Sequence, residues 1–168
     1  FYDAELRAAD RLVADVLYQL PRGAALLVTA DHGQVQVGAN IVHPSSELLA
    51  LCTVQSGEGR FRWLHARRGA ADDDRRRAAL ERKRQEAAVE EVGGVAWVRP
   101  REQLIADGWF GPVVAPDVAH RLGDVAVVAF ADVSFDDPDD SGPFELICRH
   151  GSLTSAEVYV PLLAGMRG

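Results

Sequence analysis

The stretch LLVTADHG, residues 26–33, constrains the fold of this chain more than any other feature. It belongs to an apolar run over residues 24–30, which is typical of a short strand buried on both faces of a parallel sheet. The run ends in Asp31, His32 and Gly33. Ligands in open α/β sheets bind beyond the carboxyl ends of the strands, so we expect functional side chains at this point.

Asp31 and His32 provide a carboxylate oxygen and an imidazole nitrogen side by side. These two ligand types suit zinc or a similar transition metal. On a loop after the strand both side chains can turn toward one point, and we expect Gly33 to free the backbone for that turn. The alternative is a turn aspartate and a surface histidine that are neighbours by chance, and the tripeptide alone does not decide between the two.

The rest of the chain alternates helical and strand-like patterns, which predicts an α/β protein. Apolar residues at spacings of three and four predict an amphipathic helix over residues 3–20. No internal repeat or linker separates the 168 residues, so we treat residues 1–168 as a single unit. The other predicted elements are two strand-like runs within residues 48–68 around a Gly-rich turn at 56–59, a charged helix over 72–92, a strand over 93–100, a short helix over 101–108 closed by Gly108, and a strand over 123–133.

Composition excludes several classes of function. With 48% hydrophobic and 26% charged residues, the chain is typical of a soluble globular domain, and no apolar run is long enough to predict a membrane span. No signal peptide is visible and two cysteines do not make a disulfide framework, so we expect a cytoplasmic setting. The net charge of -7 argues against a nucleic-acid partner.

A second motif, CRHGSLTSAEVYVPLL, occupies residues 148–163. A strand-like run again ends in a His-Gly pair, at His150 and Gly151. Thr154 and Glu157 form a capping-box pattern, which predicts that a helix starts there and gives Thr154 a structural role. Ser152 could act as a nucleophile, but no general base lies beside it in sequence, so a turn role is favoured.

The pair of motifs carries a family resemblance. VTADHG, followed 118 residues after His32 by HGSLTSAEVYVPLL, resembles the C-terminal half of the alkaline phosphatase superfamily, and within it the type I phosphodiesterase/nucleotide pyrophosphatase branch. The runs SGEGRFRWLHAR, REQLIADGWFGP and RLGDVAVVA resemble an uncharacterised bacterial subgroup. The resemblance implies an alkaline-phosphatase-like α/β/α sandwich with a mostly parallel central sheet. It also implies two divalent metal ions, commonly zinc.

The resemblance assigns roles to individual residues. Asp31 and His32 match the pair that holds the metal nearest the nucleophile, and His150 matches the late histidine that holds the other metal. Two neighbouring metal sites require the ligand atoms of Asp31, His32 and His150 to converge within roughly 8 Å. The substrate implied is a phosphate ester or a nucleotide-like small molecule.

The chain departs from the family pattern in its ligand set. The family's first metal-binding Asp, its Thr or Ser nucleophile and its Asp-x-x-x-His pair have no counterpart here. We therefore expect residues 1–168 to be the C-terminal portion of a metal-dependent phosphodiesterase or phosphatase-like catalytic domain. We expect it to be inactive without an N-terminal half and to dimerise through exposed surfaces. The alternative is a non-catalytic α/β interaction module with vestigial metal-ligand positions.

Three other patterns leave more than one interpretation each. RFRWLHARR could bind nucleic-acid bases, or Arg60 and Arg62 could bind a substrate phosphate, but a half-buried strand with its basic residues on the wet face is favoured. Cys148 and His150 could share a metal, but a core cysteine is favoured. The acidic run 136–140 could attract calcium, but it lacks EF-hand spacing, so a solvated loop is favoured.

Overall fold

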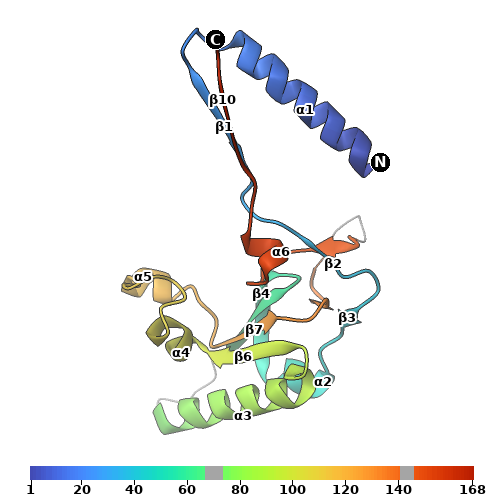
Figure 1. Ribbon diagram of the computed structural model, residues 1–168. Helices are drawn as coiled ribbons and strands as arrows, with labels where there is room; N and C mark the ends of the chain where they lie inside the picture. Colours follow the sequence, from blue (N-terminus) through green and yellow to red (C-terminus); the bar gives the residue numbers. More distant parts are fainter. Residues whose placement is uncertain (67–73, 141–145) are drawn as a thin grey trace. The chain divides into compact units, whose positions relative to one another are not determined.

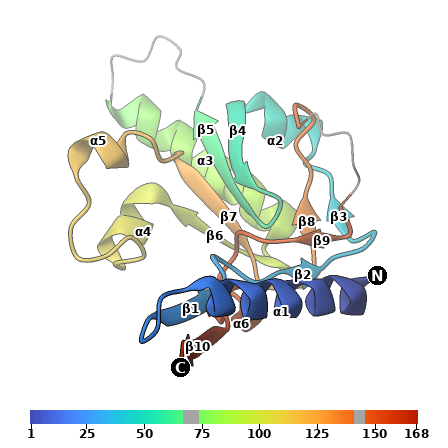
Figure 2. The same cartoon turned by 90° about the horizontal axis from the view of Figure 1, so that it is seen from above.

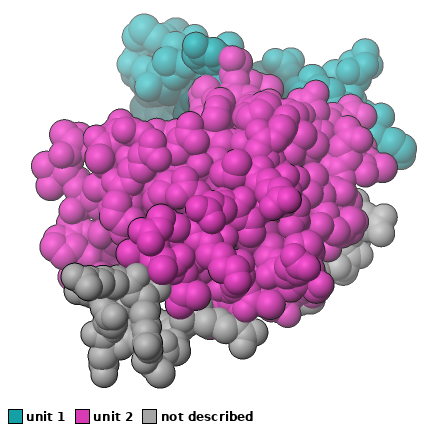
Figure 3. All heavy atoms as spheres, turned by 90° about the horizontal axis from the view of Figure 1, so that it is seen from below, with its two compact units in different colours: residues 1–33, 159–168 teal, residues 34–158 magenta. Residues whose placement is uncertain are grey.

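The computed structural model describes residues 1–66, 74–140 and 146–168, without the side chains of residues 74–77 (Figure 1). The chain divides into two compact units, where the sequence analysis treats it as one. Unit 1 comprises residues 1–33 and 159–168, and unit 2 comprises residues 34–158 (Figure 3). Unit 2 is therefore an insertion within the sequence of unit 1.

Unit 1 consists of one helix and one pair of strands. Helix α1 spans Tyr2–Gln19, which confirms the helix expected over residues 3–20. Strand β1 (Ala25–Thr29) pairs antiparallel with β10 (Leu162–Met166), so the two ends of unit 1 meet in one ladder. A methyl group of Leu17 on α1 lies 3.2 Å from the position that a Cβ atom on Gly165 would occupy. The helix therefore packs closely against β10.

The expectation that β1 is buried on both faces of a parallel sheet is wrong. Its residues alternate between exposed and half-buried, and the side chain of Leu27 is 66% exposed. Its only strand partner in the described residues is β10, which runs antiparallel. An apolar run predicts a strand, but burial on both faces also requires covering layers from elsewhere in the molecule.

Unit 2 is built on a four-stranded sheet in the order β4-β5-β7-β6. The strands are β4 (Cys52–Glu58), β5 (Phe61–Ala66), β7 (Val125–Ala129) and β6 (Ala96–Pro100), and each neighbouring pair is antiparallel. In the described residues, parallel pairing is confined to β3 (Ile41–Val42) with β8 (Ser134–Phe135). The mixed α/β class is confirmed. Of the mostly parallel sheet that was expected, the described residues contain only the short parallel pair of β3 and β8.

Helices cover both faces of the sheet. Successive side chains of the two central strands, β5 and β7, point alternately into two hydrophobic cores, one on each face. On one face, Val125 and Val127 pack with residues of α2 (Ser46–Ala50) and α3 (Asp74–Val92). On the other face, Ala126 and Val128 pack with Trp63 and with Leu104 of α4 (Arg101–Ala106). Figure 2 shows α4 and α5 (Pro116–Ala119) on one side of the β4–β5 hairpin and α2 on the other. All five residues of β7 are therefore buried.

The local elements expected in unit 2 are largely confirmed. The two strand-like runs expected within residues 48–68 form a hairpin over residues 52–66, with its turn at Gly59 and Arg60 rather than at 56–59. Residues 48–50 belong to α2 instead, and residues 67 and 68 lie outside the described part. Helix α4 ends two residues before Gly108, whose φ of 75° suits glycine after a helix. The charged helix of residues 72–92 is α3; its expected first two residues lie outside the described part. No helix of the described residues is long and apolar enough to cross a membrane.

Candidate functional site

Asp31 and His32 follow the carboxyl end of β1, as predicted, with Ala30 between the strand and Asp31. The His32 amide donates a hydrogen bond to Asp31 Oδ1 at 3.1 Å, which folds the carboxylate back toward its neighbour. His32 Nδ1 lies 2.8 Å from the carbonyl oxygen of Gly33. A carbonyl oxygen only accepts hydrogen bonds, so this contact assigns a proton to Nδ1, and the neutral form of the ring then has its lone pair on Nε2.

The role expected for Gly33 is wrong in its detail. Gly33 is not among the glycines with positive φ, so the turn does not use a conformation reserved for glycine. Its contribution is the carbonyl group that holds the His32 imidazole.

The two side chains fit one metal ion by distance and by chemistry. His32 Nε2 lies 3.7 Å from Asp31 Oδ2. Zinc–ligand bonds of about 2.1 Å at a tetrahedral angle place two ligand atoms about 3.4 Å apart, close to this separation. A neutral imidazole whose other nitrogen donates to a backbone carbonyl is also the usual arrangement of a zinc-binding histidine.

His150 follows strand β9 (Cys148–Arg149), which confirms that this histidine also lies at a strand end. Strand β9 pairs antiparallel with β2 (Val35–Gln36). The carbonyl oxygen of His150 accepts a hydrogen bond from the Arg60 amide at 3.2 Å, and His150 Nε2 lies 4.0 Å from a carboxylate oxygen of Glu58. Both contacts join His150 to the β4–β5 hairpin.

The three predicted ligands fall in different units. Asp31 and His32 belong to unit 1, and His150 belongs to unit 2 (Figure 3). Their convergence on two neighbouring metals therefore stays a prediction. Within the described residues, no group of three or more His, Cys, Asp or Glu side chains is arranged to hold a metal.

The hydroxyl groups that follow His150 are engaged in structural hydrogen bonds. Ser152 Oγ donates to the carbonyl of Ala129, and Thr154 Oγ1 donates to Glu157 Oε2 at 2.5 Å. Helix α6 (Ser155–Val158) begins after Thr154 as predicted. The bonding differs from a capping box, because the Glu157 carboxylate accepts from the Thr154 hydroxyl and the Ser152 amide instead of the Thr154 amide.

Arg60 and Arg62 do not lie on a wet face of the hairpin, so that expectation is wrong. Both are buried, and Arg60 forms an ion pair with Glu157. Arg62 donates to the carboxylate of Asp140 and lies 3.7 Å from that of Asp137. These partners follow the arginines by more than 70 positions, so no local pattern in the sequence indicated them.

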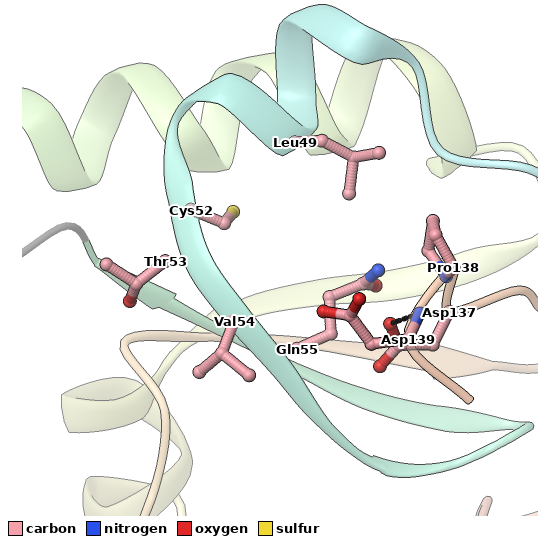
Figure 4. A pocket seen from close by; sticks show the side chains of 8 residues that line it. All are labelled: Leu49, Cys52, Thr53, Val54, Gln55, Asp137, Pro138 and Asp139. Carbon is pink, nitrogen blue, oxygen red and sulfur yellow. Dashed lines mark hydrogen bonds between the residues drawn. The ribbon is translucent and has the colours of Figure 1, made fainter. Parts of the chain in front are cut away.

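The acidic run of residues 136–140 is only in part the solvated loop expected. Asp137 is buried beside Arg62, whereas Asp139 is exposed. A hollow of about 200 Å³ lies at this place. Figure 4 shows the side chains that line it and the bond from the Asp139 amide to Asp137 Oδ1. Its lining residues are Leu49, Cys52, Thr53, Val54, Gln55, Asp137, Pro138 and Asp139. The hollow contains no histidine and none of the predicted ligands.

Comparisons with known proteins identify a family model and solved structures that this chain is similar to. A family model described as type I phosphodiesterase / nucleotide pyrophosphatase matches residues 2–153. Two solved structures of phosphonoacetate hydrolase from Sinorhizobium meliloti 1021, in complex with phosphonoformate and with phosphonoacetate, are each 20% identical, with a TM-score of 0.49. Each match covers 84% of this chain and 36% of that chain, so the chain spans about a third of that hydrolase.

No curated protein matches the sequence. The family model nevertheless covers nearly all of the 168 residues, including Asp31, His32 and His150. The chain belongs to the type I phosphodiesterase/nucleotide pyrophosphatase family, a branch of the alkaline phosphatase superfamily.

Proposed function

We propose that this chain is the C-terminal part of a two-metal hydrolase of phosphate esters. Asp31 and His32 hold one divalent ion, zinc by its ligand types, and His150 holds the other. Membership of the family supports this role. The observation that carries it is the turn after β1, where His32 Nε2 and Asp31 Oδ2 lie 3.7 Å apart while Nδ1 is held by the Gly33 carbonyl.

The proposal gives a defined role to each residue of the turn after β1. Asp31 and His32 bind the same ion, and the Gly33 carbonyl fixes the tautomer and the plane of the imidazole. Bound divalent ions polarise a phosphoryl group and activate a hydroxyl or water at neutral pH. Ser152 and Thr154 donate their hydroxyl protons to other groups, so we assign the nucleophile to neither of them. In this proposal the nucleophile comes from residues outside this chain.

The charge of the chain supports a dependence on metal ions. The net charge of -7 repels a phosphate ester or nucleotide-like substrate. Arg60 and Arg62 are buried in ion pairs, so neither compensates for this repulsion by binding the phosphate. Bound cations would supply the positive charge that the substrate needs.

Zinc titration calorimetry tests the ligand assignment. We expect weak binding by the isolated chain, because a catalytic zinc normally has about three protein ligands and this pair supplies two. Asp31→Asn and His32→Ala should each weaken it further, by more than the roughly tenfold lost with an outer hydrogen-bond partner. His43→Ala is the matched control, because His43 Nδ1 lies 3.0 Å from Asp136 Oδ2 in a second His–Asp pair. Sensitivity to His43→Ala instead of His32→Ala would locate the ligands elsewhere.

Hydrolysis of a bis-aryl phosphate tests the reaction. The isolated chain should show none, a longer protein that includes the upstream sequence should hydrolyse the ester, and His32→Ala should abolish most of that activity. The alternative of a non-catalytic interaction module predicts no hydrolysis by the longer protein.

We also propose self-association through the apolar side chains that unit 1 leaves exposed, among them Leu27, Leu162 and Met166. Sedimentation velocity at a series of concentrations should detect it.

A further inference from the structure

A fully buried ion pair lies beneath the segment that carries His150. Arg60 has no exposed surface and Glu157 is 3% exposed. Arg60 Nε donates to Glu157 Oε1 at 2.9 Å and Nη2 donates to Oε2 at 3.1 Å, so the contact is bidentate. Arg60 Nη1 donates to the carbonyls of Ala131 and Val133, both at 2.8 Å. The guanidinium thus joins Glu157 to the loop that follows β7.

The Glu157 carboxylate is saturated with donors. Beyond the two bonds from Arg60, Oε1 accepts from the Ser152 amide at 2.9 Å and Oε2 accepts from the Thr154 hydroxyl at 2.5 Å. Burial alone would raise the pKa of Glu157, but the bonds from Arg60, Thr154 and Ser152 outweigh it and lower the pKa. The carboxylate is therefore charged at neutral pH.

Two bonds reach the backbone just after the His150 side chain, one from the Arg60 backbone amide and one to the Glu157 carboxylate. The Arg60 amide donates to the carbonyl of His150, and the Glu157 carboxylate accepts from the amide two residues later, at Ser152. Gly151 between them has a φ of 113°, and a Cβ at this position would lie 2.9 Å from Glu58 Cβ. A side chain other than hydrogen does not fit there, so the path from residue 150 to residue 152 is closely confined.

A buried pair of this kind adds little net stability compared with apolar residues of the same shape, so stability alone does not explain it. Its geometry has a more specific effect, because a fully bonded polar network permits one arrangement of the segments that it joins. Metal-binding histidines depend on such outer partners for their orientation. We propose that Arg60 and Glu157 are positioning residues that hold the His150 imidazole in one orientation. The use of that orientation for metal binding rests on the function proposed above.

The first test uses the full chain without metal. Three-bond NMR couplings report whether His150 has one χ1 rotamer. We expect one rotamer in the wild-type chain and averaging in Arg60→Lys and Glu157→Gln, with faster amide exchange at Ser152. The matched control is Arg62→Lys, a buried arginine on the same hairpin whose bonds go to Gly57, Phe135 and Asp140. It should keep the single rotamer.

The milder variant Thr154→Val removes only one bond to Glu157 and serves if the others do not fold. It should give partial averaging. Averaging of His150 in the wild-type chain, retention of one rotamer in the folded variants, or equal averaging in Arg62→Lys would overturn the positioning role.

The second test follows the ring resonances of His150 during a zinc titration. The zinc concentration that half-saturates the response should rise by about 10–100-fold in Arg60→Lys and Glu157→Gln, as for lost outer partners of other metal-binding histidines. It should not change in Arg62→Lys. If the ring resonances of His150 in the wild-type chain do not change with zinc, the proposed role of His150 in metal binding is contradicted. The positioning role is still decided by the three-bond couplings of the first test.

Discussion

The two units differ in what they bury. Among the described residues, every buried side chain belongs to unit 2, and unit 1 contributes only exposed and half-buried ones. Helix α1 has the clearer apolar stripe in the sequence, yet none of its residues is buried. Helix α3 is highly charged, yet its Ala88 is completely buried and its Val92 nearly so.

This contrast shows that an apolar pattern predicts which face of an element can be buried, not whether it is buried. The two faces of the unit 2 sheet are covered by helices that arrive from distant parts of the chain. Strand β1 has a single partner strand in the described residues and contacts helix α1, and alternate residues of its apolar run stay exposed. Stability should therefore be concentrated in unit 2.

Hydrogen exchange should show the largest difference between the units. Amides of β7 are expected to exchange only through global unfolding, and amides of α1 through local opening. For a domain of ordinary stability this separates the rates by roughly a thousandfold or more, after correction for intrinsic rates. Equal protection of α1 and β7, measured by mass spectrometry on peptides, would remove the contrast.

Truncation of one leucine in each unit should lower the free energy of unfolding by very different amounts. Leu64 is 2% exposed and lies in the core of unit 2, so Leu64→Ala should lower the free energy of unfolding by about 2–5 kcal/mol. Leu27→Ala in unit 1, where the side chain is 66% exposed, should change it by no more than about 0.5 kcal/mol. Urea unfolding monitored by far-ultraviolet circular dichroism, to which helix α1 of unit 1 contributes, measures both, and similar losses would show that unit 1 is packed in solution.

Acid should weaken unit 2 through Glu157. Its pKa lies below the ordinary value of 4.5 in the folded state, so its contribution to stability is complete above that value and is lost as the pH falls through the lowered pKa. Glu157→Gln should have a lower urea midpoint near neutral pH and a flatter decline in acid than the wild-type chain. Parallel declines of the two proteins would mean that another carboxylate controls the acid limb.

The smallest effect is expected at Glu81 on α3. Partial burial and the nearby Glu102 carboxylate raise its pKa above the ordinary value. A raised carboxylate pKa opposes folding once the group ionises, so Glu81→Gln should slightly increase stability at neutral pH and have no such effect in acid. Thermal unfolding at the two pH values measures the difference, and Glu86→Gln on the same helix is the control.

The local elements follow from the sequence alone. The helix of residues 3–20, the end of α4 before Gly108 and the strand that contains β7 were all predicted from spacing and from turn residues. The adjacent Asp31–His32 pair was predicted in the same way, because both residues follow one strand. Such features depend on residues within one segment, and their periodicity is visible in the sequence.

Which distant segments meet is visible in the three-dimensional structure and not in the sequence. The antiparallel pairing of β1 with β10, the bond between Arg60 and Glu157 at 97 positions apart, and the burial of Asp137 beside Arg62 have no local signal. Each depends on loop closure and on the shapes of surfaces formed by distant parts of the chain. Arg60 in particular has the sequence context of an exposed basic residue, and only its distant carboxylate partner makes its burial favourable.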